Sequence, residues 1–469
     1  MQTECNPDQL VFESFDKRHV VAAFDGGAIT SNAGALLLRH TNKAINLFDR
    51  VASCFIDHRK EELVVHGLPA MVGQRIAGIA LGYEDIEDHD ELRHDPVLGL
   101  LSDRLEPKRE DCAALAGKST LNRLEHAPAD EPGGESERYH KIGHDKAAIE
   151  HLFVDLFLEA HKKPPKEIVL DLDATDDPIH GHQEGRFFHG YYDCYCYLPL
   201  YIFCGKQLLA AKLRVADIDG AAGAKEEVER IVARVREVWP RTRIVLRADS
   251  GFAREDLMAW CEANRVDYIL GLAKNARLLA AIPEELAQAK AIFEAHGEVG
   301  GPGKTAAARR FKDFTYRTKD SWSQARRVVG KAEHLAKGAN PRFVVTSLSR
   351  SKIAARALYE DLYCARGEME NRIKECQLDL FADRTSAKTM RANQLRLWFS
   401  SFAYVLIEAL RRLALKHTRL ENATCGSIRL KLLKIGARVR VSLRRIMISM
   451  ASAHPYHNEF ALAHARLLP

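Results

Sequence analysis

Between residues 164 and 275 the chain alternates between strand-like and helix-like segments, and this alternation limits the fold more than any other feature. "KEIVLDLDAT" is a predicted strand, and "CYCYLPLYIFC" with "QLLAAKLRV" is a predicted hairpin that turns at Gly205. Two amphipathic helices, "AKEEVERIVARVREVW" and "AREDLMAWCEANR", alternate with the strands "RTRIVLRADSGF" and "DYILGLA". Three strands followed by helix, strand, helix and strand predict an α/β fold, with helices packed on a mixed sheet.

The chain of 469 residues is longer than one hydrophobic core usually supports, so several parts are expected. Helical patterns precede the alternating segment, strand-like pieces such as "RRVVGKAEHL" and "RFVVTSLS" follow it, and helical patterns return from Ile353. We predict five consecutive ranges: a mainly helical region 1–163, a core 164–275, a β-rich insertion 276–350, further core helices 351–400 and a basic region 401–469.

Positive charge is concentrated at the C-terminal end. The formal net charge is only +5, but the segment from Thr385 onward has 15 Lys and Arg against 3 Glu. In "RLKLLKIGARVRVSLRRI", Arg438 and Arg440 share one face if the segment is extended. Such local basicity favours a polyanionic partner, although a solvated basic surface is equally compatible with it.

Cysteine usage and the N-terminal residues bear on the cellular location. The ten cysteines include no CxxC pair, and the closest group (Cys194, Cys196 and Cys204) lies in an apolar run, which favours reduced thiols over a zinc site. "MQTECNPDQL" lacks the basic start and apolar run of a signal peptide, and no apolar stretch is long enough to span a membrane. We therefore expect a cytoplasmic protein.

Acidic residues occur where two predicted strands end. "VLDLDATDD" is apolar until Asp171 and Asp173, which share one face of the strand, and "IVLRADSGF" ends at Asp249. Strand ends are where sites form in α/β sheets, so these carboxylates are candidates for ligand binding. The alternative is turn capping, which suits Asp176 and Asp177 better than an acid inside an apolar run.

A third candidate carboxylate lies on the predicted helix that contains "YCARGEMENRIKECQ". At about 100° per residue, one flank of this helix carries four polar side chains, with Lys374 at its outer edge: Tyr363, Arg366, Glu370 and Gln377. Glu375 is expected farther round, towards solvent. The alternative for Arg366 and Glu370 is an ordinary surface ion pair one helical turn apart.

Two strand carboxylates and one helix carboxylate suggest a magnesium site, because Mg²⁺ prefers oxygen ligands and retains several waters. Pairs of such ions activate the attacking oxygen and stabilise the leaving oxygen in phosphoryl transfer. Mn²⁺ is expected to substitute for Mg²⁺.

The motifs "LDLDAT", "LRADSGF" and Y-x2-R-x3-E, in this order, resemble the DDE transposases of bacterial insertion sequences. The chain is most similar to the branch with a Tyr-Arg-Glu-Lys signature, insertion-sequence family thirteen-eighty, and "KSTLNRLE" and "HGHQEG" extend the resemblance. The resemblance implies a ribonuclease-H-like fold with a β-rich insertion before the last catalytic helix, and helical regions at both ends.

The resemblance also implies roles for individual residues. Asp173, Asp249 and Glu370 take the places of the catalytic, metal-binding triad, although sheet geometry leaves Asp171 open as the first acid. Tyr363 and Arg366 take the places that hold the transferred DNA end and its phosphates. The signature's Lys is replaced here by Gln377, which adds no charge, and Lys374 is expected to compensate as a further DNA contact.

The implied activity is cleavage of the element's terminal inverted repeats and joining of the 3′ ends to target DNA. Double-stranded DNA is then the partner, a homodimer is expected in the transposition complex, and the N-terminal region is expected to bind the DNA ends. The alternatives are a metal-dependent nuclease without strand transfer and an inactive DNA-binding protein. In "HGHQEG", His180, His182 and Glu184 are alternative metal ligands or DNA contacts.

Overall fold

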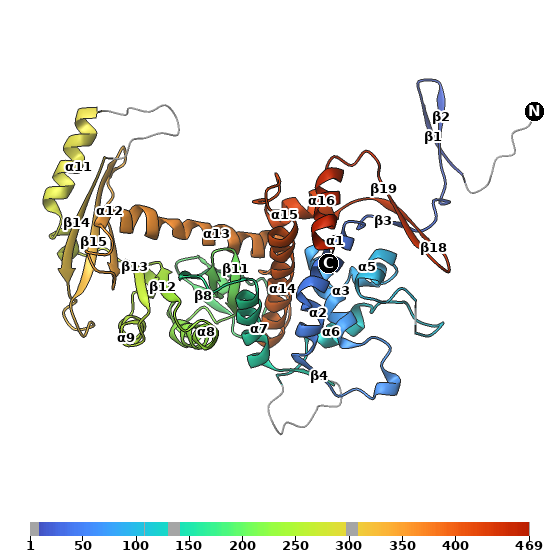
Figure 1. Cartoon of the computed structure of the whole chain (residues 1–469), viewed down its shortest axis with the longest axis horizontal. Helices are drawn as coiled ribbons and strands as arrows, with labels where there is room; N and C mark the ends of the chain where they lie inside the picture. The colour runs from blue at the N-terminus through green and yellow to red at the C-terminus, as the bar shows by residue number, and fades with distance from the viewer. Residues whose placement is uncertain (1–8, 107, 130–140, 297–307, 469) are drawn as a thin grey trace, which may run out of the picture. The chain divides into compact units, whose positions relative to one another are not determined.

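The structure is a computed structural model that describes residues 9–106, 108–129, 141–296 and 308–468 (Figure 1). Its contacts divide the chain into two compact units, one of residues 1–144 with 402–469 and the other of residues 145–401. Residues 1–8, on which the expectation of no signal peptide largely rests, lie outside the described residues. In the described part, no helix has both the length and the apolar character needed to cross a membrane.

The first unit contains both ends of the chain and is largely helical. Its helices are α1 (Ala35–Ile45), α2 (Leu47–Ala52), α3 (Leu68–Ala80), α4 (His89–Leu92), α5 (Pro96–Leu101), α6 (Lys118–Glu125), α15 (Cys425–Ile428), α16 (His457–Leu467) and the later part of α14 (Met390–Ala414). Almost every residue of α3 is buried, so this helix is the centre of the unit. Gly34 lets the start of α1 approach the chain closely, since a Cβ there would lie 1.9 Å from the carbonyl oxygen of Leu432.

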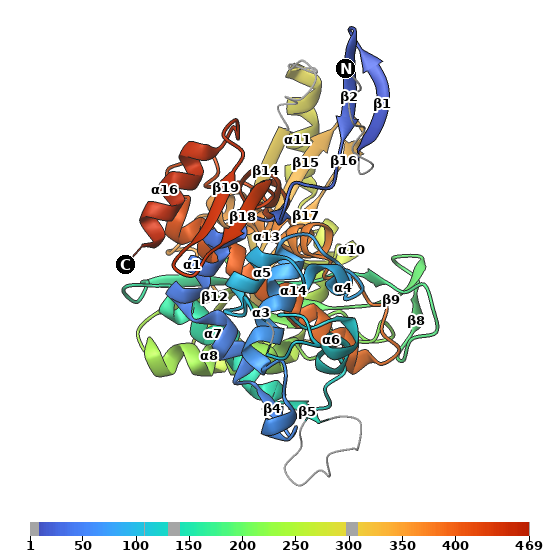
Figure 2. The same ribbon diagram turned by 90° about the vertical axis from the view of Figure 1, so that its right-hand side faces the viewer.

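The first unit also contains strands, which the sequence patterns did not predict. These are β1 (Leu10–Phe15), β2 (Arg18–Ala22), β3 (Ile29–Thr30), β4 (Phe55–Asp57), β5 (Ile142–His144), β18 (Ala437–Val441) and β19 (Ile446–Met450). β1 and β2 form a separate antiparallel ribbon in which every residue is exposed (Figures 1 and 2). Arg438 and Arg440 lie on β18 and are both exposed, as an extended segment requires.

The second unit is built on a nine-stranded mixed sheet. Its strands are β6 (Glu167–Ala174), β10 (Leu200–Cys204), β11 (Gln207–Lys212), β12 (Arg243–Ala248), β13 (Asp267–Leu272), β14 (Ala308–Tyr316), β15 (Arg326–Leu335), β16 (Gly338–Ala339) and β17 (Arg342–Thr346). The order is β11-β10-β6-β12-β13-β17-β15-β14, and β16 pairs with β15. β6, β12 and β13 are parallel to one another, whereas β10, β11 and β17 join the sheet by antiparallel pairing. This arrangement confirms the predicted mixed α/β architecture.

Both faces of the central strands are covered, which explains their almost continuous apolar sequences. On one face, α7 (Lys146–Glu159), α8 (Ala224–Val238) and α9 (Glu255–Ala263) pack against side chains such as Ile244 and Leu246. On the other face, Val245 and Ile269 pack against Leu358 at the start of the last helical segment of the unit. Figure 1 shows α8 and α9 on the opposite side of β12 and β13 from α13 (Gly367–Lys374). The sheet therefore holds this helical segment against the strand that leads to Asp249.

The structure divides the chain differently from the five predicted ranges. Helix α7, which we predicted in the region 1–163, belongs to the second unit because its buried face packs on β11 and α8. The predicted insertion 276–350 contains two helices, α10 (Ala276–Leu279) and α11 (Pro283–His296), as well as strands. Its strand β17 pairs with β13, so the insertion extends the same sheet. Residues 297–307 of this range lie outside the described residues.

The last helical segment of the second unit changes its winding along its length. It runs through α12 (Ala355–Ala357), the π-helix η3 (Leu358–Tyr363), the short 3-10 turn η4 (Cys364–Arg366), α13 and the π-helix η5 (Glu375–Asp379). The prediction that Glu375 faces solvent is wrong. Glu375 is 3% exposed and pairs with Arg372 at 2.5 Å, at the point where α13 passes into the π-turn of η5.

The remaining small elements of the second unit form a three-stranded sheet near the start of the core. It consists of β7 (Asp177–Pro178), β8 (Phe187–His189) and β9 (Cys194–Tyr197). The cysteines that the structure describes are all free thiols. Cys194 and Cys196 lie within β9, next to buried apolar residues.

Candidate active site

The two strand-end aspartates lie on neighbouring parallel strands. β6 and β12 pair in register, with Leu172 opposite Ala248, so Asp173 and Asp249 are the next residues along their chains at the same edge of the sheet. Asp249 follows β12 directly, and its Oδ1 accepts a hydrogen bond of 2.8 Å from the backbone N–H of Gly251. This bond caps the short turn η2 (Ser250–Phe252) and fixes the position of the Asp249 side chain.

Asp171, the alternative first acid, has a partner inside the core. Its carboxylate receives two hydrogen bonds from Arg247, at 2.5 and 2.8 Å, and both side chains are less than 10% exposed. The two residues lie opposite each other on β6 and β12. Asp171 is therefore fully engaged in a buried bidentate ion pair, whereas Asp173, two residues on, faces the edge where Asp249 lies.

Arg366 joins Asp173 to the helix. Its Nη1 donates to Oδ2 of Asp173 at 3.0 Å, and its Nη2 donates to Oε1 of Glu370 at 2.8 Å. The Arg366 side chain is only 18% exposed, and that of Glu370 is 46% exposed. The Arg–Glu pair of the helix is thus not an isolated surface pair, because the same guanidinium bridges to a carboxylate of the sheet 193 residues earlier.

The surroundings of Asp173 disfavour its ionised form. Burial raises the pKa of its carboxyl group to about 6, Arg366 opposes this rise, and the carboxylates of Asp249 and Glu370 add to it. For Arg366, burial lowers the pKa, but Asp173 and Glu370 more than compensate, so the guanidinium remains charged. The charges of Asp173, Asp249 and Glu370 repel one another, and the one cation Arg366 compensates for them only in part.

The three carboxylates fit a divalent cation in their chemistry but are not preassembled around one. In the part of the chain that the structure describes, no group of three or more His, Cys, Asp or Glu side chains is placed to hold a metal ion. The guanidinium of Arg366 instead occupies the space between two of the acids. Carboxylate oxygens are nevertheless the ligands that Mg²⁺ prefers in proteins.

Tyr363 lies against Gly271, near the end of β13. A Cβ atom at Gly271 would come within 2.7 Å of the Tyr363 hydroxyl and 2.8 Å of the Ser250 backbone nitrogen, so only glycine allows this approach. Burial raises the pKa of Tyr363, Arg366 lowers it and Asp249 raises it, which places the hydroxyl within electrostatic reach of the site.

The two remaining residues of the predicted DNA-binding set differ in their surroundings. Lys374 is exposed, one turn after Glu370, and has no ion pair within the described ranges. Gln377 is half-buried, and its Nε2 donates to the backbone carbonyl of Asp176 at 2.9 Å and to Oδ1 of Asp177 at 2.8 Å. The side-chain amide group of Gln377 thus ties η5 to the segment that follows Asp173.

"HGHQEG" forms a loop rather than a strand, with Gly185 in the left-handed region at φ 71°. Gln183 donates to the carbonyl oxygen of Thr385 at 2.9 Å, and Glu184 accepts a bond of 3.1 Å from the backbone N–H of Met390, at the start of α14. Nδ1 of His182 lies 3.4 Å from Nη1 of Arg186. The loop therefore links the core to α14, and none of its side chains joins a metal-binding cluster within the described residues.

Two cations that the sequence reasoning missed line a pocket beside Asp249. The pocket has a volume of about 460 Å³, and its lining includes Asp249, Tyr363, Arg366, Lys274 and Arg342. Lys274 follows β13 by two residues, and this position at the end of a parallel strand was a usable signal. Arg342 begins β17, inside the predicted insertion, and only the pairing of β17 with β13 brings it here.

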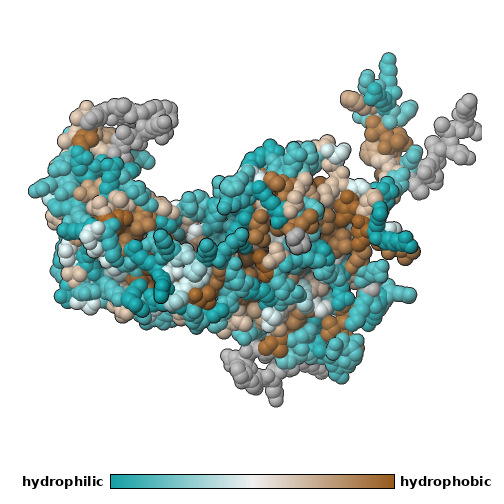
Figure 3. All heavy atoms as spheres, in the orientation of Figure 1, coloured by the Kyte–Doolittle hydropathy of each residue, from teal (hydrophilic) through white to brown (hydrophobic). Residues whose placement is uncertain are grey.

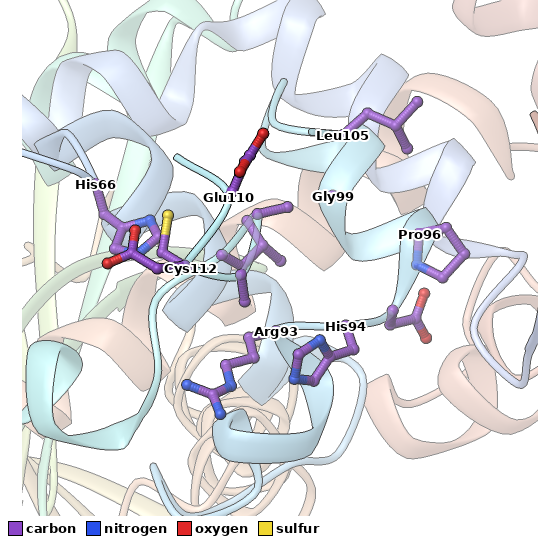
Figure 4. A pocket seen from close by; sticks show the side chains of 13 residues that line it. His66, Arg93, His94, Pro96, Gly99, Leu105, Glu110 and Cys112 are labelled. Carbon is purple, nitrogen blue, oxygen red and sulfur yellow. The ribbon is translucent and has the colours of Figure 1, made fainter. Parts of the chain in front are cut away.

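A larger pocket, of about 640 Å³, lies in the first unit (Figure 4). His66, Arg93, His94, Glu110 and Cys112 are among its lining residues, and none of the predicted site residues is. One lining carboxylate, Asp95, already caps α5 and accepts hydrogen bonds from Thr30 and Asn32. Within the described residues, the acids that line this pocket also form no group placed to hold a metal ion.

Comparison with known proteins bears on this arrangement. A cryo-EM structure of piggyBac transposase in a synaptic complex with hairpin DNA is similar, with a TM-score of 0.41 and 10% sequence identity, over 86% of this chain and 79% of that one. No curated protein matches the chain. The family model described as transposase DDE domain group 1 matches residues 12–469, nearly the whole chain. The chain therefore belongs to the DDE transposases, in the family of transposase DDE domain group 1.

Proposed function

We propose that this transposase cuts the terminal inverted repeats of its own insertion sequence and joins the freed 3′ ends to target DNA. The observation that carries the proposal is the bridge from Arg366 to both Asp173 and Glu370, beside Asp249. The guanidinium is held between acids from the sheet and the helix. A DNA phosphate would take over the guanidinium, and the phosphate's counter-cation would take over the acids. Membership of family thirteen-eighty remains part of the proposal.

The strand order supports a ribonuclease-H-like core. In β11-β10-β6-β12-β13, the first three strands are antiparallel neighbours and the last two run parallel to β6. We propose that this five-stranded part is the catalytic core, and that β14 to β17 are the insertion that precedes the last catalytic helix.

Asp173, Asp249 and Glu370 are the proposed catalytic residues. They would hold Mg²⁺, or Mn²⁺ in its place, which supplies Lewis-acid stabilisation of the phosphate oxygens. In the first step water attacks the phosphate at the element's end and the bond from phosphorus to the 3′ oxygen breaks. In the second step the freed 3′-hydroxyl attacks a target phosphate, and the target strand breaks at its own 3′ oxygen.

Four polar side chains are the proposed DNA contacts of this site. Arg366 would turn part of its guanidinium from the carboxylates to the scissile or a neighbouring phosphate, which its two existing bonds position it to do. The hydroxyl of Tyr363 would donate a hydrogen bond to the DNA backbone, and the exposed Lys374 would add a phosphate contact. Gln377 would act mainly through its bonds to Asp176 and Asp177, with its amide oxygen left for DNA.

A homodimer is the proposed state in the transposition complex, because two ends must be cut together. The ribbon of β1 and β2 supports this proposal: it pairs with no other strand in the described residues, and a lone hairpin is marginally stable. Its exposed apolar side chains, some of which Figure 3 shows, would be covered by the second copy: Leu10, Val11, Phe12, Phe15, Val20 and Val21. Light scattering of the parent and of a Phe12→Ser, Phe15→Ser variant, each with end DNA, tests this assignment.

The function is tested by incubating the protein with Mg²⁺ and the DNA that flanks its own gene. In a bacterial cell this DNA is part of the nucleoid. Cutting at the repeats followed by joining of a precut end supports transposition. Cutting without joining would favour a nuclease of the same core. Binding that persists in EDTA, with no cutting when Mg²⁺ or Mn²⁺ is added, would favour an inactive DNA-binding protein.

A further inference from the structure

The pocket of about 460 Å³ beside Asp249 is lined by two cations that the catalytic proposal does not use. We propose that Lys274 and Arg342 bind a DNA backbone phosphate next to the one that is cut. This inference rests on the proposed function, since it assumes that DNA lies across Asp173 and Asp249. It adds a phosphate-binding site formed by the end of β13 and by the insertion.

The sheet topology brings these residues together from distant parts of the sequence. β12 and β13 are parallel, so Lys274, two residues after β13, lies at the same edge as Asp249, which follows β12. β17 is antiparallel to β13, with Phe343 opposite Leu272, so the beginning of β17 lies at that edge too. Arg342 is the first residue of β17 and therefore faces the end of β13.

Neither cation is neutralised by the protein. Lys274 and Arg342 are both exposed, and neither side chain has an ion pair or hydrogen bond to any residue in the described ranges. By contrast, Arg326 and Arg327 of neighbouring β15 are paired with carboxylates. Free cations in a concave site raise the local concentration of anions, and a phosphodiester fits a Lys beside an Arg.

The other walls of the pocket suit a nucleotide backbone. Tyr363 and Arg366 line it on the side of the helix, and the largely buried rings of Phe343 and Tyr359 complete its wall. The positive charge of Arg342 acts on Tyr363, whose pKa it lowers against the larger effect of burial. Gly271 keeps the wall next to the Tyr363 hydroxyl free of a side chain.

Phosphate binding by these residues is tested by the salt dependence of DNA binding in EDTA, where no cutting occurs. Lys274→Gln and Arg342→Gln remove one charge each and keep much of the side chain. Lys352→Gln and Arg241→Gln are matched controls. Both cations are exposed and have no ion pair among the residues that the structure describes, and they lie beyond the ends of β17 and β12 that are farther from the pocket. Fluorescence anisotropy with end DNA gives the dissociation constant at several salt concentrations.

Each site variant is expected to weaken binding several-fold and to reduce the slope of log K against log salt by about 1, because one phosphate contact releases about one counterion. The controls are expected to match the parent. A neutral methylphosphonate can replace one phosphate of the DNA at a time. At a position beside the cleaved bond, this replacement should weaken binding of the parent. It should have no further effect there on the variant that carries both Lys274→Gln and Arg342→Gln.

The inference is overturned if the double variant has the slope and affinity of the controls, or if no single phosphate position distinguishes it from the parent. These readouts need no cleavage. A chain that binds ends through Lys274 and Arg342 but never cuts would refute the proposed function alone, and a chain that cuts while both variants bind normally would refute this inference alone.

Discussion

Gln377 donates a hydrogen bond of 2.8 Å to Oδ1 of Asp177, and the Asp177 side chain is completely buried. The other carboxyl oxygen of Asp177 has no hydrogen-bond partner in the described part of the chain. Burial raises the pKa of Asp177 well above its usual value, and the bond from Gln377 opposes this only in part. The raised pKa favours the protonated form of Asp177, and a neutral Gln suits that form where a Lys was expected.

Asp177→Asn is expected to stabilise the chain at neutral pH. Because the folded-state pKa is raised, the stability that Asp177 contributes is fully present below its unfolded pKa of about 3.9 and is lost as the pH rises through the folded value. Asn accepts the same bond from Gln377 without holding a proton. We predict a midpoint of thermal unfolding a few degrees above that of the parent at pH 8, with a smaller difference at pH 4, by calorimetry. A lower midpoint for the variant at pH 8 would mean that Asp177 is ionised.

Asp171 and Asp173 are expected to separate into a structural and a catalytic acid. Asp171→Ala removes both acceptors that Asp171 offers to the buried guanidinium of Arg247, and should cost about 3–5 kcal/mol of unfolding free energy because a buried charge loses its partner. Asp173→Asn retains an acceptor for Arg366, so it should change stability by less than about 1 kcal/mol and abolish cleavage. Urea unfolding and DNA cleavage measured on both variants check this. An Asp173→Asn protein that still cuts would transfer the role to Asp171.

Arg366→Ala is expected to reduce cleavage by about a hundredfold, the typical cost of losing one group that stabilises charge in a transition state. It should also lower the salt sensitivity of end binding. Arg356→Ala is the matched control, because Arg356 pairs with Glu360 at the same spacing on the same helical segment but has no bond to Asp173. The control should lose only a few tenths of a kcal/mol of stability. Equal effects of the two changes would make Arg366 an ordinary helix-surface partner.

His89 provides a prediction for the first unit. It is fully buried, Gln74 bonds to its Nδ1 at 3.0 Å, and burial lowers its pKa to about 3, with Arg75 adding to the shift. The unfolded chain takes up this proton near pH 6.5 but the folded chain does not, so stability falls as the pH falls from 6.5 towards 3. The loss due to His89 is about 2 kcal/mol at pH 5. Hydrogen exchange of α3 at pH 7 and pH 5, in the parent and in His89→Gln, measures it, and an identical pH dependence would contradict a neutral His89.

The alternation of strands and helices in the core was predictable because buried parallel strands and amphipathic helices leave clear local patterns. The hairpin at Gly205, α8, α9 and the strand before Asp249 all follow from them. The ribbon β1–β2 was not predictable, since its apolar residues are exposed and follow neither period. Glu375 is buried in an ion pair with Arg372 at the start of a π-turn, and a uniform helical pattern predicts neither feature.

The candidate site was only partly readable from the sequence. Acids at strand ends are a local signal, which together with the resemblance led us to predict Asp173, Asp249 and Glu370, and their catalytic role stays a prediction. That Asp171 is paired inside the sheet depends on the register of β6 against β12, which brings together residues 76 positions apart. Arg342 joins the site only through the antiparallel pairing of β17 with β13, so no local pattern contains it.

The central claim is that Asp249 takes part in cutting DNA, and one variant tests it most directly. Asn at position 249 retains an oxygen that can accept the cap bond from Gly251, so the fold is expected to survive. Exposed Asp256, on the first turn of α9, gives the matched control Asp256→Asn. With Mg²⁺ and end DNA, we predict that Asp249→Asn does not cut while it binds the ends within a few-fold of the parent, and that the control cuts normally. Cleavage by Asp249→Asn at the parent's rate would contradict the account.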